Sequence, residues 1–276
     1  MLKVLLFLIL LFACCLAQLQ AQTRIIVLDV KEGQSVLIQH FSDGWLIDTG
    51  HLGQSVNIIE KLRQYGVSNI QGIILTHLHP DHASGYFRLK EDFPSAKIFS
   101  NCHPLPENIQ PDTSRWIHEA LKKDQQHQCL TANDELNFYD VRMMILWPYE
   151  FINNNLNHHS LVINIAVDDN NILLMGDADR QAEQTLLSKK TLPTNISTLI
   201  VGHHGANDAT STTFLKNIKP KSAIISTNKD NIRGYPSKST IERLISMGVK
   251  IQQTATHSDI SIPLNLKDTI KGVGDK

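Results

Sequence analysis

The sequence lacks a large net charge, internal repeats and low-complexity segments. Its 276 residues include 26 lysines and arginines and 27 aspartates and glutamates, which gives a formal charge of −1. A chain without a basic balance is not, as a whole, a basic nucleic-acid-binding protein. In the absence of repeats, this length predicts one large domain or two small ones, with enough residues for a sizeable core.

Runs of like charge are also missing, but the basic residues are unevenly spread. From Asn207 to the end there are 11 lysines and arginines and 6 aspartates and glutamates, an excess of five positive charges. A basic surface near a site attracts phosphates. Scattered, solvated lysines are the alternative interpretation of the same excess.

Long apolar runs are absent except at the start of the chain. Lys3 precedes an apolar run over residues 4–17, and small and polar residues follow it. A run of about 14 residues is too short to span a bilayer, which needs about 20. The pattern predicts a secretory signal peptide over residues 1–22. A buried N-terminal helix and a lipoprotein cleavage box ending at Cys14 are the alternatives.

The rest of the chain, residues 23–276, is expected to form the mature domain. No later segment is apolar enough to cross a bilayer. We therefore expect a periplasmic or secreted protein without an integral membrane segment once the signal peptide is removed.

Cysteine is scarce in the mature chain, where only Cys102 and Cys129 remain. In an oxidising compartment two such cysteines most simply form one disulfide. A small zinc site is an alternative, because His103 follows Cys102 and His127 lies two residues before Cys129. Free thiols are the third interpretation.

What the chain has in abundance is short strand patterns that alternate with amphipathic helix patterns. Strands are predicted over residues 24–30, 35–41, 45–50, 70–77, 96–101, 138–148, 160–167, 171–177, 197–205, 222–227, 250–256 and 259–264. Helices are predicted over residues 53–66, from about 83, and over 114–124, 179–190, 211–218 and 237–248. Both halves place strands first and strand–helix units second, which favours two sheets flanked outside by helices. The polar residues 105–136 resemble an insertion or lid beside the sheet.

The segment THLHPDH directly follows one of the buried strands. It contains His77, His79, Asp81 and His82, with Pro80 stiffening the bend. In such a turn the first two histidines converge on one point and the last two residues on a neighbouring point. Imidazole and carboxylate ligands suit zinc, and also manganese or iron. The spacing predicts two metal ions, one for each pair of residues.

Other predicted strands also begin or end at metal-capable residues. His158 and His159 precede one strand, Asp177 ends another, and His203 and His204 end a third. Strand ends that each deliver a histidine or an aspartate are what a shared two-metal pocket requires.

The segment THLHPDH resembles the signature of the metallo-β-lactamase superfamily. Further segments resemble the hydrolase domain of the ComEC competence-protein family, and the likeness extends from about residue 24 to residue 265. These segments are LDVKEGQSVLI, LIDTG, NHHSLVINI, LLMGDAD, LIVGHHGANDATSTTFLKNIKPKSAIIS and YPSKSTIERL. The resemblance implies an α/β fold, a four-layer αββα sandwich with metals at one edge between the sheets.

The resemblance also assigns roles to residues. It makes His77 and His79 ligands of the first metal, completed by one of His158 and His159. It makes Asp81 and His82 ligands of the second metal, completed by His203, with Asp177 bridging the two and Asp48 supporting the pocket. Asp81 would orient the nucleophilic water, and His204 would assist the leaving group or pack beside the ligands.

Two positions depart from the ComEC-like pattern. Such domains usually read Asn-x-x-Ser without histidine where this chain has Asn157-His158-His159-Ser160, and Tyr235 stands where relatives often have histidine. The membrane channel of full ComEC proteins is absent, so DNA translocation is not expected of this chain.

We therefore expect a secreted hydrolase that uses two zinc ions, with phosphodiester bonds of nucleic acid or nucleotides as its substrate. Hydrolysis of a β-lactam, lactone or thioester is the alternative, since the same site can support it. A metal-binding scaffold without turnover is a further alternative.

Overall fold

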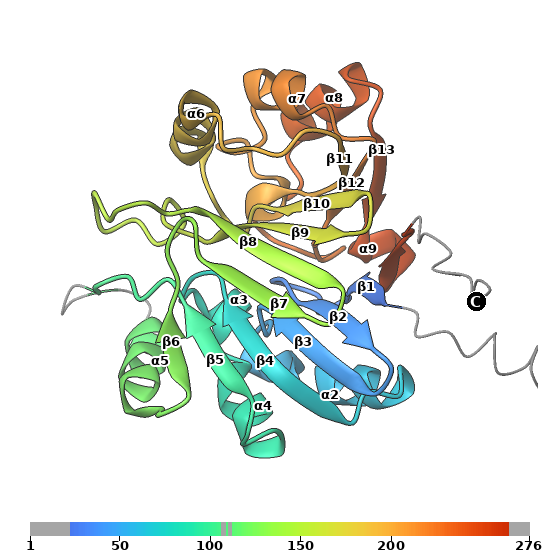
Figure 1. The fold of residues 1–276 in the computed structure, drawn as a ribbon. Helices are drawn as coiled ribbons and strands as arrows, with labels where there is room; N and C mark the ends of the chain where they lie inside the picture. The colour runs from blue at the N-terminus through green and yellow to red at the C-terminus, as the bar shows by residue number, and fades with distance from the viewer. Residues whose placement is uncertain (1–22, 106–108, 110–111, 265–276) are drawn as a thin grey trace, which may run out of the picture.

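The computed structural model describes residues 23–105, 109 and 112–264, and the predicted signal peptide lies outside these residues. The chain forms two mixed sheets that face each other (Figure 1). The first sheet contains, in spatial order, β14 (Ile260–Ile262), β1 (Arg24–Val27), β2 (Val36–His40), β3 (Asp43–Ile47), β4 (Asn69–Leu75), β5 (Lys97–Ser100) and β6 (His127–Cys129). The second contains β13 (Lys250–Gln253), β12 (Ser222–Ile225), β11 (Ile196–Ile200), β10 (Asn170–Leu174), β9 (Val162–Val167), β8 (Val141–Trp147) and β7 (Glu135–Phe138).

Each sheet combines antiparallel strands with strands that run parallel. Strands β3 to β6 are parallel in the first sheet, and β10 to β13 are parallel in the second. Parallel neighbours need crossover connections, which place helices on the sheet faces. The helical segments are η1 (Leu52–Gln54), α2 (Ser55–Gln64), α3 (Pro80–Ala83), α4 (Tyr86–Asp92), α5 (Asp112–Lys123), α6 (Arg180–Lys189), η2 (Gly202–Gly205), α7 (Thr212–Ile218), α8 (Lys238–Ser246) and α9 (Thr254–His257).

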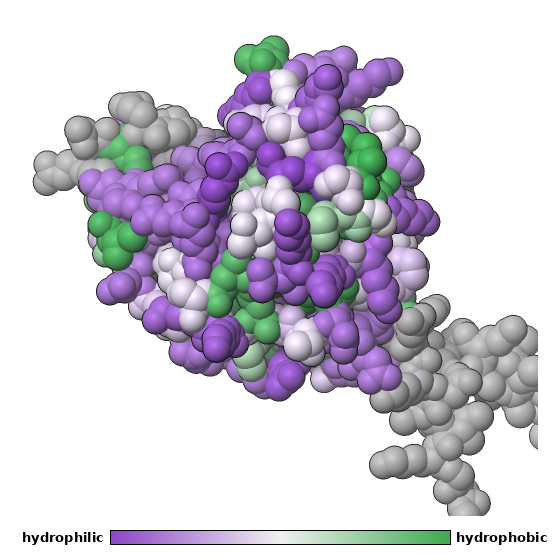
Figure 2. Space-filling view, turned by 90° about the horizontal axis from the view of Figure 1, so that it is seen from above, coloured by the Kyte–Doolittle hydropathy of each residue, from purple (hydrophilic) through white to green (hydrophobic). Residues whose placement is uncertain are grey.

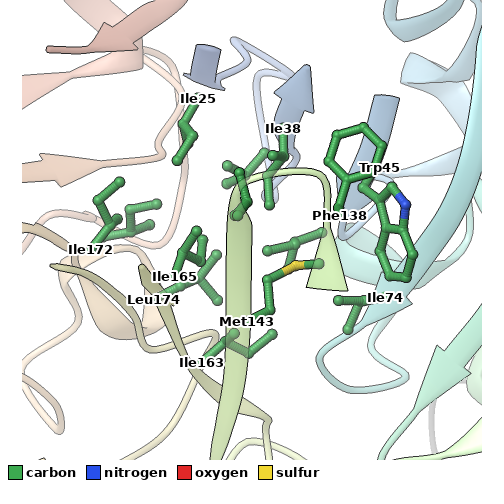
Figure 3. Packing of buried hydrophobic residues seen from close by; sticks show 14 of the residues in the cluster. Ile25, Ile38, Trp45, Ile74, Phe138, Met143, Ile163, Ile165, Ile172 and Leu174 are labelled. Atoms are coloured by element: carbon green, nitrogen blue, oxygen red, sulfur yellow. The ribbon is translucent and has the colours of Figure 1, made fainter. Parts of the chain in front are cut away.

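The central strands bury both of their faces, so successive residues enter different cores. In β1, Ile25 and Val27 point into the core between the sheets, whereas Ile26 packs under the helices on the outer face. Figure 3 shows the inner core, where Ile25, Ile38, Trp45 and Ile74 of the first sheet face Met143, Ile163, Ile165, Ile172 and Leu174 of the second.

The helices complete the outer layers of the molecule. Helices α2, α4 and α5 cover the first sheet, and α6, α7 and α8 cover the second (Figure 1). Seen from the side of α6, α7 and α8, the surface is mainly hydrophilic, with small apolar patches between polar groups (Figure 2). The order helix, sheet, sheet, helix confirms the predicted αββα sandwich. Within the described ranges, no helix has the length and apolar character needed to cross a membrane.

The described part of segment 105–136 lies against the first sheet and extends it, which fits an insertion beside the sheet better than a lid. Its helix α5 buries Ile117 and Leu121 against the first sheet, and β6 extends that sheet beside β5. Cys102 and Cys129 form a disulfide that joins the end of β5 to β6, so the disulfide interpretation is confirmed. The polar composition of this segment reflects an edge position.

Some element boundaries also differ from the prediction. The strand predicted over 138–148 is the second half of a hairpin, because β7 and β8 pair across a tight turn at Tyr139 and Asp140. The strand predicted over 250–256 ends at Gln253, and the short helix α9 begins at Thr254.

Candidate metal centre

The histidine-rich segment begins directly after β4 leaves the first sheet. Pro80 is the first residue of helix α3, and His79 before it keeps an extended backbone with φ −66° and ψ 145°. The fixed φ of proline suits the first position of a helix. The extended part therefore presents His77 and His79, and the helix presents Asp81 and His82.

One group of buried side chains joins the two sheets. Asp177 follows β10 of the second sheet, and its Oδ1 atom lies 3.1 Å from Nε2 of His82. Its other oxygen, Oδ2, lies 3.7 Å from Nε2 of His77. Both histidines are fully buried. These three side chains lie close enough together to hold one metal ion.

A second group shares His82 with the first. His204 places its Nε2 atom 3.1 Å from Nε2 of His82, 3.7 Å from Oδ2 of Asp81 and 3.6 Å from Oδ1 of Asp177. Asp81, His82 and His204 are therefore also grouped closely enough for an ion. Asp177 faces both groups, and the resemblance gives it the role of a bridging carboxylate.

The outward-facing nitrogens of these histidines are held by fixed partners. Nδ1 of His82 donates to Asp48 Oδ2 at 2.7 Å, and Nδ1 of His204 donates to the carbonyl oxygen of Ser226 at 3.0 Å. A partner on one ring nitrogen fixes the tautomer and directs the other nitrogen, as in many metal sites. Both Nε2 atoms are thereby directed into the cluster.

The donor set fits a cation. In the neutral rings, with Nδ1 of His82 and His204 carrying the protons, two Nε2 lone pairs face each other at 3.1 Å, so a proton or a metal ion must lie between them. Oδ1 of Asp177 is buried and accepts no hydrogen bond of good geometry from any described residue. Buried lone pairs and an uncompensated carboxylate oxygen are unfavourable unless a positive charge lies among them.

Without an ion, the positive charge in the cluster is a proton on His82. Burial opposes protonation of this ring, but the carboxylates of Asp177 and Asp48 outweigh burial and hold its pKa well above the usual value. Burial likewise opposes the charge on Asp177, yet His82 and His204 keep the pKa of that carboxyl well below its usual range. Burial lowers the pKa of His204, which is therefore neutral.

Asp48 supports His82 from behind, as the resemblance implies. It is fully buried and accepts hydrogen bonds from the backbone N–H and the hydroxyl of Thr76, at 2.7 and 2.9 Å, and from the amide of Gln34 at 2.9 Å. With four donors in place, its carboxylate has one fixed orientation.

His203 and His204 are neighbours in sequence but serve different parts of the site. Both have left-handed backbone angles, φ 49° and 51°, between Gly202 and Gly205. This conformation sends His204 inward, whereas Nε2 of His203 stands 3.9 Å from Oδ2 of Asp177. The structure therefore places His204, and not His203, beside Asp81 and His82.

His203 instead faces the cavity and forms a dyad with Asp208. Its Nδ1 lies 2.9 Å from Asp208 Oδ1, and its Nε2 lies 3.2 Å from the side-chain amide of Asn157. Burial disfavours the charged ring, but the hydrogen bond to Asp208 and the charge of Asp177 raise the pKa of His203 above its usual value.

The segment Asn157–Ser160 reaches the cluster through its ends. Asn157 contacts His203, and Ser160 Oγ lies 3.3 Å from Nδ1 of His77. It also accepts a hydrogen bond from the backbone N–H of Asp177 at 3.0 Å.

The two histidines between these ends lie in neither of the two three-residue groups described above. Nδ1 of His158 pairs with Asp179 at 2.8 Å, and its Nε2 has no partner among the described residues. Nδ1 of His159 lies 3.0 Å from His103, and its Nε2 accepts from the backbone N–H of Ile152. Consecutive residues on a turn point in different directions, which the sequence alone did not reveal.

A cavity of about 490 Å³ opens over the cluster, a volume within the range of small-molecule sites. His79 stands at its wall, with Nδ1 3.0 Å from Nε2 of His77. The residues lining the cavity are Glu32, His51, His79, Pro80, Asp81, Asn157, Asp177, His203, Arg233 and Tyr235. Glu32, His51, Asn157 and Arg233 were not predicted. They come from loops far apart in sequence and carry no spacing signal.

Comparison with known proteins supports the resemblance. The family model described as "Metallo-beta-lactamase superfamily" matches residues 28–98. Recombination protein 2 of Haemophilus influenzae is 29% identical over 85% of this chain, and Competence protein ComA of Neisseria gonorrhoeae is 26% identical over 84%. The chain spans only 28% and 31% of these relatives' own lengths.

A solved structure supports the fold independently. The metallo-beta-lactamase fold protein YhfI from Bacillus subtilis aligns with a TM-score of 0.58 over 87% of this chain and 100% of its own, at 12% identity. Residues 28–98 thus match the metallo-β-lactamase superfamily, and the chain shares the fold of a solved protein that is named for that fold.

Proposed function

We propose that this chain is a metal-dependent hydrolase whose preferred substrates are phosphodiesters of nucleic acid or nucleotides. One observation carries the proposal: His82 and His77 of one sheet meet Asp177 and His204 of the other around a buried point that requires a positive charge. Such a set is costly to bury unless it binds a cation.

The residues present would hold up to two ions such as zinc, and His82 would bind only one of them, through Nε2. His77, His82 and Asp177 form one candidate donor set and Asp81, His82 and His204 form the other, with His79 and His203 at the cavity wall. Nitrogen and carboxylate donors also accept manganese or iron. When bound, such ions supply Lewis acidity and make hydroxide available near neutral pH.

In this proposal the chain's own residues orient the substrate and move protons. Asp81 lies at the cavity wall, where its carboxylate can orient a nucleophilic water. His203 also faces the cavity, and Asp208 behind it favours the protonated ring that a general acid needs. We therefore revise the roles expected from the sequence: His204 becomes a metal ligand and His203 the general acid.

Several features support a phosphodiester substrate. One relative is named for recombination, a process of DNA, and another for competence. Basic residues are in excess after Asn207, and basic residues near a site attract phosphates. Hydrolysis of a lactam, lactone or thioester is the competing activity, and a metal-binding scaffold without turnover is the third.

Export from the cytoplasm completes the proposal. The predicted signal peptide stays a prediction, but the disulfide between Cys102 and Cys129 suits an oxidising compartment. We propose that residues 23–276 act as one hydrolase domain in the periplasm or outside the cell.

A substrate panel tests the activity. Metal-loaded protein is incubated in parallel with bis-p-nitrophenyl phosphate, DNA, nitrocefin and a lactone. Release of p-nitrophenol from the diester, or cleavage of DNA, is the expected result. Turnover of nitrocefin or the lactone alone would replace the phosphodiester assignment, and bound metal without any turnover would favour the scaffold.

Two variants test the site. His79→Ala and Asp177→Ala should lower turnover at least a hundredfold, since both side chains face the proposed ions. His257→Ala is the matched control, because His257 is an exposed histidine of α9. Full activity in both site variants would refute the proposed centre.

A further inference from the structure

We infer that Arg233 determines substrate specificity by binding the negative charge of the substrate's phosphate. This inference rests on the proposed function and extends it, because it names the group that distinguishes anionic from neutral esters. Arg233 is not part of either predicted metal pair.

Arg233 belongs to a loop that is fixed beside the metal centre. The side chain of Asn231 accepts a hydrogen bond from the N–H of Tyr235 at 2.8 Å and donates to the carbonyl of the same residue at 2.6 Å. Ser237 N donates to the carbonyl of Gly205 at 2.9 Å. The loop therefore holds its place against the turn that carries His203 and His204.

The packing at this turn is close. A Cβ added to Gly205 would lie 2.7 Å from Cβ of Pro236, so the turn and the loop contact each other directly. The ring of Tyr235 lies 5.4 Å from that of His203 and stacks on His204 at 6.5 Å. Arg233 is thus held near the histidines while its own side chain is half exposed.

Apart from its histidines, the cavity has mainly negative charges on its wall. Glu32, Asp81 and Asp177 are acidic, and Arg233 is the one lysine or arginine among the lining residues that the structure describes. A guanidinium presents five N–H donors in a planar fork that matches two oxygens of a phosphate. No other described lining residue offers a permanent positive charge to a substrate.

The ion pairs of Arg233 are loose enough to be exchanged. Its two terminal nitrogens lie 3.3 Å from Asp81 Oδ2 and 3.2 Å from Glu32 Oε1, which exceeds the roughly 2.7–2.9 Å of strong charge-assisted hydrogen bonds. Arg233 and Glu32 each have 48% exposed side chains, and pairs so exposed add little stability. A structural role for this pair is therefore weak, and a phosphate can displace it.

The test compares an anionic and a neutral ester on the metal-loaded protein. Bis-p-nitrophenyl phosphate and p-nitrophenyl acetate release the same product, so their kcat/KM ratio isolates the effect of charge. Arg233→Met should lower this ratio about tenfold to a hundredfold, mainly through KM for the diester. Arg233→Lys should restore part of it, because lysine keeps the charge but not the fork.

Lys229→Gln provides the matched control. Lys229 is an exposed residue of the same loop and does not line the cavity, so its loss removes one positive charge elsewhere. The ratio should stay within twofold in this variant. Equal losses for both esters in Arg233→Met, or an unchanged ratio, would overturn the inference.

Binding of inorganic phosphate separates this inference from the proposed function. Calorimetry on metal-loaded protein should detect phosphate affinity that falls at least tenfold in Arg233→Met and not in Lys229→Gln, at equal metal content. If no ester is hydrolysed but this difference appears, the proposed function fails and the anion site stands. If esters are hydrolysed and phosphate affinity is equal in all variants, only the role of Arg233 fails.

Discussion

The two adjacent histidines of η2 divide the work of the site between binding and proton transfer. His204 is buried among Asp81, His82 and Asp177, whereas His203 stands in the cavity with Asp208 behind it. Left-handed backbone angles are uncommon for residues with a side chain and occur at functional sites. Here they direct the ring of His204 into the buried cluster and the ring of His203 into the cavity.

Substitution of each histidine separates these roles. His204→Ala should lose at least half of the bound metal, because one donor set then retains only Asp81 and His82. His203→Ala should keep its metal and lose turnover, with a larger loss for a dinucleotide than for bis-p-nitrophenyl phosphate. Nitrophenol needs little protonation to leave, whereas a nucleoside hydroxyl needs a proton from a general acid.

Metal analysis and steady-state kinetics on the two variants provide the measurement. Asp208→Asn should resemble His203→Ala in its dependence on the leaving group, because it removes the charge that favours the protonated ring. Metal loss in His203→Ala together with full metal in His204→Ala would reverse the assignment.

At this scale the sequence predicted what is local. His77, His79, Asp81 and His82 lie on one short segment whose geometry follows from a strand end and a proline. The directions of His158, His159, His203 and His204 depend on turns with contacts from distant residues. Arg233 gave no signal, since an isolated arginine in a loop resembles any solvated arginine.

Among the structural elements, the loop between β1 and β2 determines where helix α3 can lie. Gly33 has φ +104°, and a Cβ there would stand 1.8 Å from the backbone oxygen of Asp81. Gln34 N donates to that oxygen at 3.2 Å, and Ser226 Oγ donates to the carbonyl of Gly33 at 2.7 Å. The backbone of this loop thus touches both α3 and the second sheet.

Gly33→Ala should therefore displace Asp81 and weaken the metal centre. Gly66→Ala is a matched control, because Gly66 also has a positive φ, +76°, but nothing lies within 4 Å of its added Cβ. Strain alone costs about 1–2 kcal/mol at such a residue. Denaturation and metal analysis should show a small stability loss in Gly66→Ala, and a larger one with reduced metal content in Gly33→Ala. Equal effects would contradict the contact argument.

The strands and the main helices were predictable because both patterns are strong here. Continuous apolar runs predicted most strands, and apolar residues at helical spacing predicted α2, α6 and α8. The segment 105–136 was misjudged because edge strands and exposed helices carry many polar residues. Strand β6 has only three residues, too few for a clear alternation of apolar and polar side chains. Its place in the sheet is determined by its pairing with β5.

At the scale of the whole molecule, the candidate centre connects the two halves of the sandwich. His77 and His82 follow β4 of the first sheet, whereas Asp177 and His204 follow β10 and β11 of the second. Ions bound there would add a crosslink at the sheet edge to the apolar core between the sheets.

Metal removal should consequently lower thermal stability as well as activity. A ligand present at a hundredfold excess over its Kd stabilises the folded state by about 2.7 kcal/mol. For a domain of this size that corresponds to a melting temperature about 5–10 °C higher. Calorimetry with and without a chelator provides the measurement, and Asp177→Asn should show little difference between the two conditions. An identical melting temperature in the chelated wild-type protein would argue against bound ions.

The pairing of β1 with β14 has a consequence for synthesis. Ile25 lies opposite Ile262, so the strand translated first among those described is flanked by the one translated last. Until that final strand leaves the ribosome, the emerging polypeptide presents an open β edge to every neighbour it meets. Partly translated molecules are therefore most exposed to pairing through β1 before residues 260–262 have been added.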